Sequence, residues 1–330
     1  MNLRRFWTAL AASAGLLALV SIAAPLIGSA HIGYARAWAG ASPDHEILFY
    51  VRLPRVLLAM IAGGTLAVTG VLVQAILREP LAEPFTLGIS SGSSLGAVLA
   101  ICFGWRSILG IPGTWVAAFT GAAVTLVLVL AIAFERRRVS SFTLLLAGVS
   151  INSIAMATIL FLHNVATFSQ SFAITRWLMG GLDAVEMRVL AGLAAVILPV
   201  IMVLFWRARD WNLLAVGEEW ASSRGVNATR TLVAGYVAGS LMTGSVTAFT
   251  GPIGFIGLIV PHGLRIVFGA DHRVLVPCSF LIGAAFLVIC DTVARTILSP
   301  TEVPVGVITA LLGGPFFIWL LRSKRRSLWL

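Results

Sequence analysis

The sequence predicts an all-α, polytopic membrane protein, and three observations lead to that fold class. First, 59% of the 330 residues are hydrophobic and only 11% are charged, less than half of the roughly 25% that is usual in soluble domains. Second, apolar stretches near or above the roughly 20 residues that cross a bilayer recur along the whole chain. Third, these stretches are continuous rather than alternating, which favours helices over the strands of a membrane barrel.

Ten membrane spans follow from these stretches, within a single domain that covers residues 1–330. The first stretch follows two arginines and resembles a signal peptide, but its apolar run is longer than a typical signal core, so we expect a retained helix. The predicted spans are about 6–27, 54–77, 86–104, 114–134, 142–163, 188–206, 229–249, 253–268, 274–297 and 303–321.

The distribution of basic residues indicates a lipid bilayer and no nucleic-acid partner. The net charge is +10, but the cations lie between the apolar segments instead of clustering on one surface. With both termini placed in the cytoplasm, 16 of the 23 Lys and Arg residues fall in inside segments, in agreement with the positive-inside rule. The inside residues are Arg4, Arg5, Arg78, Arg136, Arg137, Arg138, Arg207, Arg209, Arg224, Arg230, Arg265, Arg273, Arg322, Lys324, Arg325 and Arg326.

Small residues and prolines predict how the helices pack. Gly88, Gly92 and Gly96 recur every four residues, a spacing that lets helix backbones approach closely in lipid. The segment 250–262 holds two prolines and three glycines among apolar residues, which predicts a short, interrupted helix. Such a helix is tolerated where it faces protein or a water-filled cavity, so it either lies near a transport path or is a structural kink.

The sequence predicts no bond chemistry on this chain. Its only lysine is Lys324 in the tail, so a nucleotide-binding GxxxxGK[ST] loop cannot form. Two overlapping GxSxG matches within 88–96 open an apolar helix, whereas a hydrolase elbow follows a strand. The three cysteines and five histidines lack metal-ligand spacing. We therefore expect no catalytic residue, no metal and no cofactor on this chain.

Asp291 is the exception among acidic residues that otherwise lie in loops or at the ends of spans. Arg295 follows it by one helical turn, in the acid-before-base order that suits a local ion pair. An ion pair is the preferred interpretation. The alternative is a proton relay, because carboxylates inside a membrane mark such relays, and it would make the chain a proton-coupled secondary transporter of a small organic solute.

Arginines also stand at the outer ends of two spans, opposite to the positive-inside preference. Arg52 and Arg55 precede and open the second span, and Arg295 lies at the same level. Guanidinium groups pair well with carboxylates, so these residues could form a docking surface for an acidic partner. Anchoring to lipid headgroups is the alternative, and the residues alone leave both open.

The longest inside loop, 210–228, predicts a short helix outside the membrane. Gly217 can serve as its N-cap, Glu218 and Glu219 occupy the positive N-terminal end, and Gly225 is a C-terminal stop. A capped amphipathic helix in this position indicates a partner protein. An interfacial helix on lipid is the alternative, which two adjacent acids disfavour on an anionic surface.

At these residues the chain resembles the FecCD family, the permeases of ABC importers for chelated iron, haem and cobalamin. The resemblance extends over nearly the whole chain, and its motifs are specific together although each is weak alone. The motifs are RLPR at 52–55, EPLAEPFTLGI at 79–89, LLLAGV at 144–149, WLMGGL at 177–182, GEE at 217–219, GFIGLIVPHGLR at 254–265 and EVPVGVITALLGGP at 302–315.

The resemblance implies a BtuC-like permease fold with ten helices in the bacterial inner membrane, as part of a type II ABC importer. It implies a second copy of the chain, two separate ATP-binding subunits that bind ATP and Mg, and a periplasmic substrate-binding protein. Alternating access would move the cargo along the subunit interface. The cargo expected first is an iron–siderophore, and haem or cobalamin come next.

The resemblance also implies roles for individual residues. They include a cytoplasmic gate, where Phe142 is bulkier than expected. The residues for docking the binding protein are Arg52, Arg55 and Arg295. Those for coupling to the ATPase are Gly217, Glu218, Glu219, Arg224 and Gly225. Those for the cytoplasmic gate and the path are Ser140, Ser141, Phe142, Ser150, Asn152 and Ser153.

Overall fold

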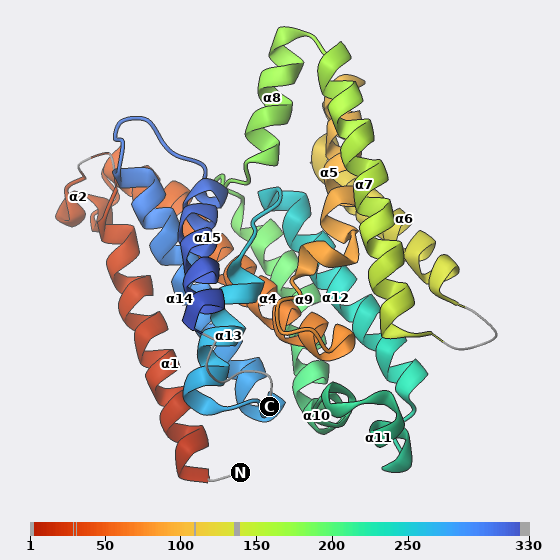
Figure 1. Ribbon diagram of the computed structural model, residues 1–330. Helices are drawn as coiled ribbons and strands as arrows, with labels where there is room; N and C mark the ends of the chain where they lie inside the picture. Colours follow the sequence, from red (N-terminus) through yellow and green to blue (C-terminus); the bar gives the residue numbers. More distant parts are fainter. Residues whose placement is uncertain (1–2, 29, 31, 109, 135–138, 324–330) are drawn as a thin grey trace.

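The computed structural model describes residues 3–28, 30, 32–108, 110–134 and 139–323 and is almost entirely helical in these residues (Figure 1). Ten helices coincide with the predicted spans to within a few residues. They are α1 (Leu3–Ala23), α4 (Leu53–Leu77), α5 (Ile89–Cys102), α6 (Gly113–Ala133), α7 (Ser141–Val165), α9 (Met187–Trp206), α12 (Ala228–Thr250), α13 (Ile256–Phe268), α14 (His272–Thr296) and α15 (Val305–Ser323).

Shorter elements connect these helices. The helical ones are η1 (Ala24–Leu26), α2 (Tyr34–Trp38), α3 (Asp44–Glu46), η2 (Ile47–Arg52), η3 (Pro84–Leu87), α8 (Phe168–Leu178), α10 (Ala208–Val216) and α11 (Glu218–Ser223). Two antiparallel strands of two residues each, β1 (Ser107–Ile108) and β2 (Ile111–Pro112), precede α6. In Figure 1, α10, α11 and the start of α1 lie at one end of the bundle, and α2 and α8 lie at the opposite end.

Seven spans in the described part of the chain are long and apolar enough to cross a membrane. They contain α1, α4, α6, α7, α9, α12 and α14, and the shorter apolar helices α5, α13 and α15 occupy the three other predicted spans. The all-α polytopic membrane fold is therefore confirmed. The count of ten crossings and the cytoplasmic position of both ends stay predictions. Of the inside cations, Arg136, Arg137, Arg138, Lys324, Arg325 and Arg326 lie outside the described residues.

Helix α4 is the central helix, buried on nearly all sides against α14, α12 and α13. A helix that is apolar all round belongs in such a position. Two of its glycines make close backbone contacts possible. A Cβ on Gly63 would lie 2.3 Å from the carbonyl oxygen of Gly283 in α14, and a Cβ on Gly70 would lie 2.0 Å from that of Gly257 in α13. Larger residues would push these helices apart.

The two sequence features that concern packing also appear in the structure. Gly92 and Gly96 of α5 face α6, where a Cβ on Gly96 would lie 2.1 Å from the carbonyl oxygen of Ala117. The expected interruption separates α12 from α13: Gly251 and Phe255 both have positive φ, 65° and 69°. The chain therefore leaves α12 and enters α13 through two residues of positive φ. A position of α13 near a transport path stays a prediction.

Candidate functional site

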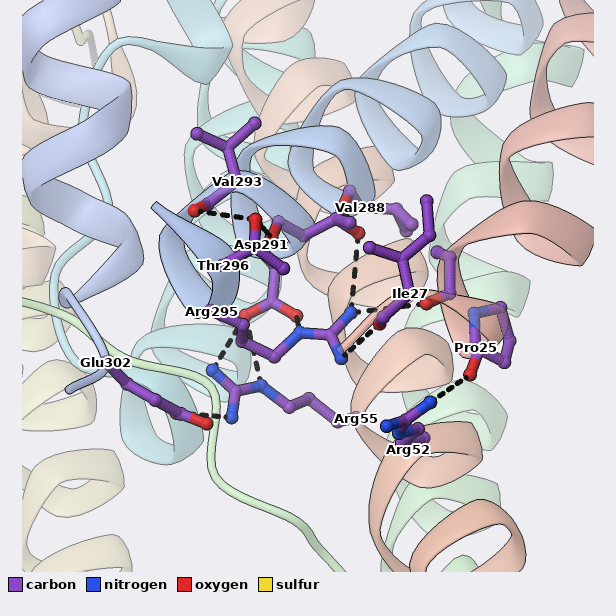
Figure 2. A network of polar contacts seen from close by, with 12 residues as sticks. Pro25, Ile27, Arg52, Arg55, Val288, Asp291, Val293, Arg295, Thr296 and Glu302 are labelled. Carbon is purple, nitrogen blue, oxygen red and sulfur yellow. Dashed lines mark hydrogen bonds and ion pairs between the residues drawn. The ribbon is translucent and has the colours of Figure 1, made fainter. Parts of the chain in front are cut away.

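The three outer arginines come together at one end of the bundle (Figure 2). Arg52 is the last residue of η2 and Arg55 lies in the first turn of α4, whereas Arg295 lies in the last turn of α14. Because α4 and α14 pack against each other, the start of the first lies beside the end of the second. Helix packing, and not proximity in the sequence, builds this cluster.

Arg55 binds two carboxylates from different elements. Its Nε and Nη2 both lie 3.0 Å from Oδ1 of Asp291, and its Nη1 donates to Oε2 of Glu302 at 2.7 Å. Asp291 is 1% exposed, whereas Glu302, in the loop between α14 and α15, is 45% exposed. Arg55 therefore joins a buried carboxylate inside the bundle to an exposed one at its surface.

Asp291 also forms the local ion pair that its spacing predicts. Its Oδ2 lies 3.0 Å from Nε of Arg295, one helical turn later. The Nη1 of Arg295 donates to the carbonyl oxygen of Ile27 at 3.3 Å, and Nη2 donates to Oγ1 of Thr292 at 3.3 Å. The ion-pair interpretation of Asp291 is confirmed, and each of its two carboxylate oxygens is held by a different guanidinium group.

Two of the three outer arginines are buried in the structure. Arg52 and Arg295 are only 5% and 4% exposed. Arg52 donates through Nη1 to the carbonyl oxygen of Pro25 at 2.9 Å and through Nη2 to that of Ala30. The physical reason is that carbonyl groups after the last turn of α1 have no helical partner, and guanidinium groups with several donors satisfy them. The docking role of these arginines stays a prediction.

At the opposite end, α11 begins and ends where the sequence predicts. Gly217 is its N-cap, and Gly225 follows it with φ 82°. The N–H of Gly225 donates to Ser222 O at 3.0 Å, and that of Val226 donates to Ala221 O at 3.0 Å. This pair of bonds is the Schellman arrangement, in which a left-handed glycine ends a helix.

The first residue of α11 connects two other elements. Oε1 of Glu218 accepts from Nη2 of Arg78 at 2.9 Å and from Oγ of Ser141 at 3.2 Å. Arg78 is the C-cap of α4, and Ser141 is the first residue of α7. The structure thus brings one predicted coupling residue, Glu218, into contact with one predicted gate residue, Ser141.

The outer face of α11 carries an exposed aromatic and cationic pair. Trp220 is 48% exposed, and the guanidinium carbon of Arg224 lies 4.8 Å from the centre of its ring. This stacking orients the indole and places a positive charge beside it. Glu219 is exposed on the same short helix. A large amphipathic side chain held in one orientation is suited to a pocket on a partner protein.

The predicted gate residues begin α7. Ser140 is the N-cap, and its Oγ accepts from the N–H of Thr143 at 3.1 Å. Ser141 is buried and Phe142 is exposed, because successive residues of a helix point in directions about 100° apart. Phe142 therefore projects away from the rest of this chain. The gate role of these residues stays a prediction.

The predicted path residues lie farther along α7. Ser150 and Ser153 are exposed and Asn152 is half-buried. Both serine hydroxyls donate within the helix, Ser150 to Leu146 O at 2.8 Å and Ser153 to Val149 O at 3.0 Å. Because these bonds satisfy the hydroxyl hydrogens, the exposed face of α7 is less polar than its sequence suggests.

One polar network was missed by sequence reasoning. Gln74, inside α4, donates through Nε2 to Ala82 O and to Gly257 O, both at 3.1 Å, and its Oε1 accepts from Arg265 of α13. A lone glutamine within an apolar run was the available signal.

In the described part of the chain, no group of three His, Cys, Asp or Glu residues could hold a metal ion.

Comparison with known proteins gives a consistent result. The FecCD transport family matches residues 16–323. The hemin transport system permease protein HmuU of Yersinia pestis is 36% identical over 316 residues, which cover 94% of each chain. The cobalamin import system permease protein BtuC of Halobacterium salinarum is 41% identical over 89% of this chain and 78% of that relative.

The fold has a solved counterpart of similar length. An inward-facing structure that is assigned to the metal-chelate type of ABC transporter has a TM-score of 0.82 and 30% sequence identity with this chain. The match covers 96% of this chain and 99% of the other. Sequence and fold comparisons therefore agree over almost the full length.

Proposed function

The chain belongs to the FecCD transport family, and from that premise we propose that it is the permease subunit of a type II ABC importer for a metal chelate. It spans the bacterial inner membrane as a dimer with a second copy of itself. Two ATP-binding subunits bind ATP and Mg and drive the transport, and a periplasmic substrate-binding protein delivers the cargo. The chain itself carries no catalytic residue.

The observation that carries this proposal is the capped helix α11. It lies outside the long helices, displays Trp220 and Glu219, and connects to α4 and α7 through Glu218. A partner that binds and displaces a helix of this kind would also displace the two long helices to which it is bonded. Alternating access follows if ATP binding and hydrolysis displace α11 and rock the two permease copies. The gate at 140–142 and the path along α7 then open in turn.

The cargo is a metal chelate of the iron–siderophore, haem or cobalamin class. The two relatives named above are a hemin permease and a cobalamin permease, which supports these two cargoes. An iron–siderophore is supported only by how common importers of that class are. The exposed face of α7 would suit a bulky chelate, because its serine hydroxyls already donate within the helix. Uptake of each of the three chelates into proteoliposomes with the complete importer would decide among them.

A proton-coupled secondary transporter is the second candidate, with Asp291 as its relay. The contacts of the Asp291 carboxylate weigh against a relay role. One carboxylate oxygen is held by Arg55 and the other by Arg295, each at 3.0 Å, so a proton would have to displace a guanidinium group. A relay needs a carboxylate that can exchange protons with water, whereas Asp291 is 1% exposed.

Replacing Trp220 by alanine tests the assignment of α11. We expect the variant to fold normally but to bind the ATP-binding subunit about thirtyfold more weakly, because buried tryptophans at interfaces contribute about 2 kcal/mol or more. The measurement is co-purification in detergent with titration of the ATP-binding subunit. Trp206, which is 75% exposed and lies at the end of α9, is the matched control. Equal loss in both variants, or none in either, would contradict the role of α11.

Replacing Glu302 by glutamine tests docking at the outer end. We propose that Arg55 is the docking cation, and that Arg52 and Arg295 position it and the neighbouring loop. Glu302 competes with a partner's carboxylate for Arg55, so its neutralisation should tighten binding of the substrate-binding protein by about threefold at low salt.

The control for this experiment is Glu46→Gln, which removes one exposed negative charge from α3 without contacting Arg55. Surface plasmon resonance at two salt concentrations separates a specific effect from a general change of charge. If both variants tighten binding equally, Arg55 is not the docking residue.

A further inference from the structure

Three elements meet at the inner end of the bundle through side chains, in what we call the three-way junction: Arg78, Ser141 and Glu218. Arg78 ends α4, Ser141 begins α7 and Glu218 begins α11. Nη2 of Arg78 and Oγ of Ser141 both approach the same oxygen of Glu218, Oε1, at 2.9 Å and 3.2 Å. A single carboxylate therefore fixes the position of α11 relative to two long helices.

The backbone at Arg78 indicates that this arginine is held in place. Its φ of 54° and ψ of 32° are left-handed, a conformation that costs about 1 kcal/mol or more for a residue with a side chain. Glycine is the usual residue at the left-handed end of a helix. A glycine would remove the strain, but it would also remove the cation that binds Glu218.

Ser141 has one hydroxyl hydrogen and two acceptors. Its Oγ lies 2.6 Å from the carbonyl oxygen of Ile76 in α4 and 3.2 Å from Oε1 of Glu218 in α11. One hydroxyl donates a single hydrogen, so the two acceptors compete for it. In this conformation the shorter contact binds α7 to α4, and the longer one reaches α11. A small displacement of α11 would change this balance.

The junction lies between the two features that transport must connect. On one side, α11 exposes Trp220 and Arg224 to a partner. On the other, α7 runs from the predicted gate to the predicted path residues. Among the described side-chain contacts, the 3.2 Å contact between Glu218 and Ser141 joins α11 to α7 directly.

We propose that Glu218 is the positioning residue that transmits the displacement of α11 to the start of α7, through its ion pair with Arg78 and its competition with Ile76 O for the hydroxyl hydrogen of Ser141. This inference rests on the proposed function, because it requires an ATPase that displaces α11. It assigns Glu218 to the inner side of α11, and not to the surface that meets the ATPase. Loss of Glu218 should therefore uncouple hydrolysis from transport without preventing assembly.

The test uses the complete importer in proteoliposomes and compares Glu218→Gln and Arg78→Gln with a matched control. The control is Arg207→Gln. Arg207 is 39% exposed and pairs with Asp210 at 2.9 Å, as Arg78 is 39% exposed and pairs with Glu218 at 2.9 Å. The control pair spans three residues of one segment, and the further bond of Arg207, to Oγ1 of Thr231 at 3.4 Å, reaches α12 and not α7. The readouts are assembly with the ATP-binding subunit, ATP hydrolysis and chelate taken up per ATP hydrolysed.

We expect both junction variants to assemble and to hydrolyse ATP within about twofold of the unmodified importer. Uptake per ATP should fall by about tenfold, the effect of losing one charge-assisted bond, while Arg207→Gln leaves it unchanged. The exchanged pair Arg78→Glu with Glu218→Arg should recover part of the uptake, because it restores the ion pair with the charges reversed.

The other outcomes are distinct. Unchanged uptake per ATP in Glu218→Gln would overturn the inference, and so would failure of that variant to bind the ATP-binding subunit, which would assign Glu218 to the ATPase interface. If the unmodified chain itself binds no ATP-binding subunit, the proposed function fails instead. Normal assembly and normal ATP hydrolysis of the single variants separate lost coupling from misfolding.

Discussion

Replacing Asp291 by asparagine should destabilise the folded chain by about 3 to 5 kcal/mol, one of the largest effects expected from a single substitution here. The carboxylate lies between two guanidinium groups, Arg55 and Arg295, with both ion pairs at 3.0 Å (Figure 2). It is 1% exposed, so water cannot replace it. An asparagine would leave the two cations close together without the charge that holds them.

The measurement is the thermal unfolding of the detergent-solubilised chain, followed by aggregation or intrinsic tryptophan fluorescence. Glu302→Gln is the matched control, because it removes a carboxylate from the same arginine at a site that is 45% exposed. Exposed ion pairs contribute about 1 kcal/mol or less, so the control should unfold close to the unmodified protein. Equal melting temperatures for the two variants would show that burial does not set the strength of this cluster.

The long helices could be predicted because continuous apolar runs of sufficient length have one solution in lipid. The interruption between α12 and α13 was visible for a related reason, since two prolines and three glycines in 13 residues cannot form one regular helix. Helix α8 was not predicted. Its 11 residues include Ser, Gln, Thr and Arg, and a short, mixed segment of this kind has no distinctive hydropathy. Its capping box at Thr167 and Gln170 was the available signal.

The candidate sites show a similar division between local and distant contacts. The ion pair of Asp291 with Arg295 follows from one helical turn, and the ends of α11 follow from Gly217 and Gly225. The bond from Arg55 to Asp291 joins residues that are 236 positions apart. Such a contact depends on which helices pack side by side, and a hydropathy pattern does not specify neighbours. The burial of Arg52 depends in the same way on where the segment after α1 lies.

The second large effect concerns the closest backbone contact of the central helix. Replacing Gly70 by alanine should destabilise the chain by about 3 kcal/mol, at the upper end of the range for overpacked cores. The added Cβ would lie 2.0 Å from the carbonyl oxygen and 2.5 Å from the Cα of Gly257. Both are backbone atoms, so no side chain can rotate away, and α13 itself must move from α4.

That displacement has a consequence beyond stability, because Gln74 lies one helical turn after Gly70 and donates to the same carbonyl of Gly257 at 3.1 Å. If α13 moves, this buried amide keeps its bond to Ala82 O but loses the acceptor of its second hydrogen, and the bond from Arg265 to Gln74 is strained as well. An unsatisfied buried polar group adds about 1 to 3 kcal/mol to the cost. Loss of uptake should therefore accompany loss of stability in this variant.

The matched control for this prediction is Gly239→Ala in α12, another helical glycine that faces α4. A Cβ there would lie 3.5 Å from Thr69 and 3.6 Å from Leu72, which are ordinary contact distances. Because alanine favours helix over glycine by about 1 kcal/mol, this variant should be as stable as the unmodified chain or more so. Thermal unfolding and uptake, measured on both variants, separate the two cases. Similar melting temperatures would mean that α13 can shift freely against α4, and that the close approach of Gly70 and Gly257 is not what holds them together.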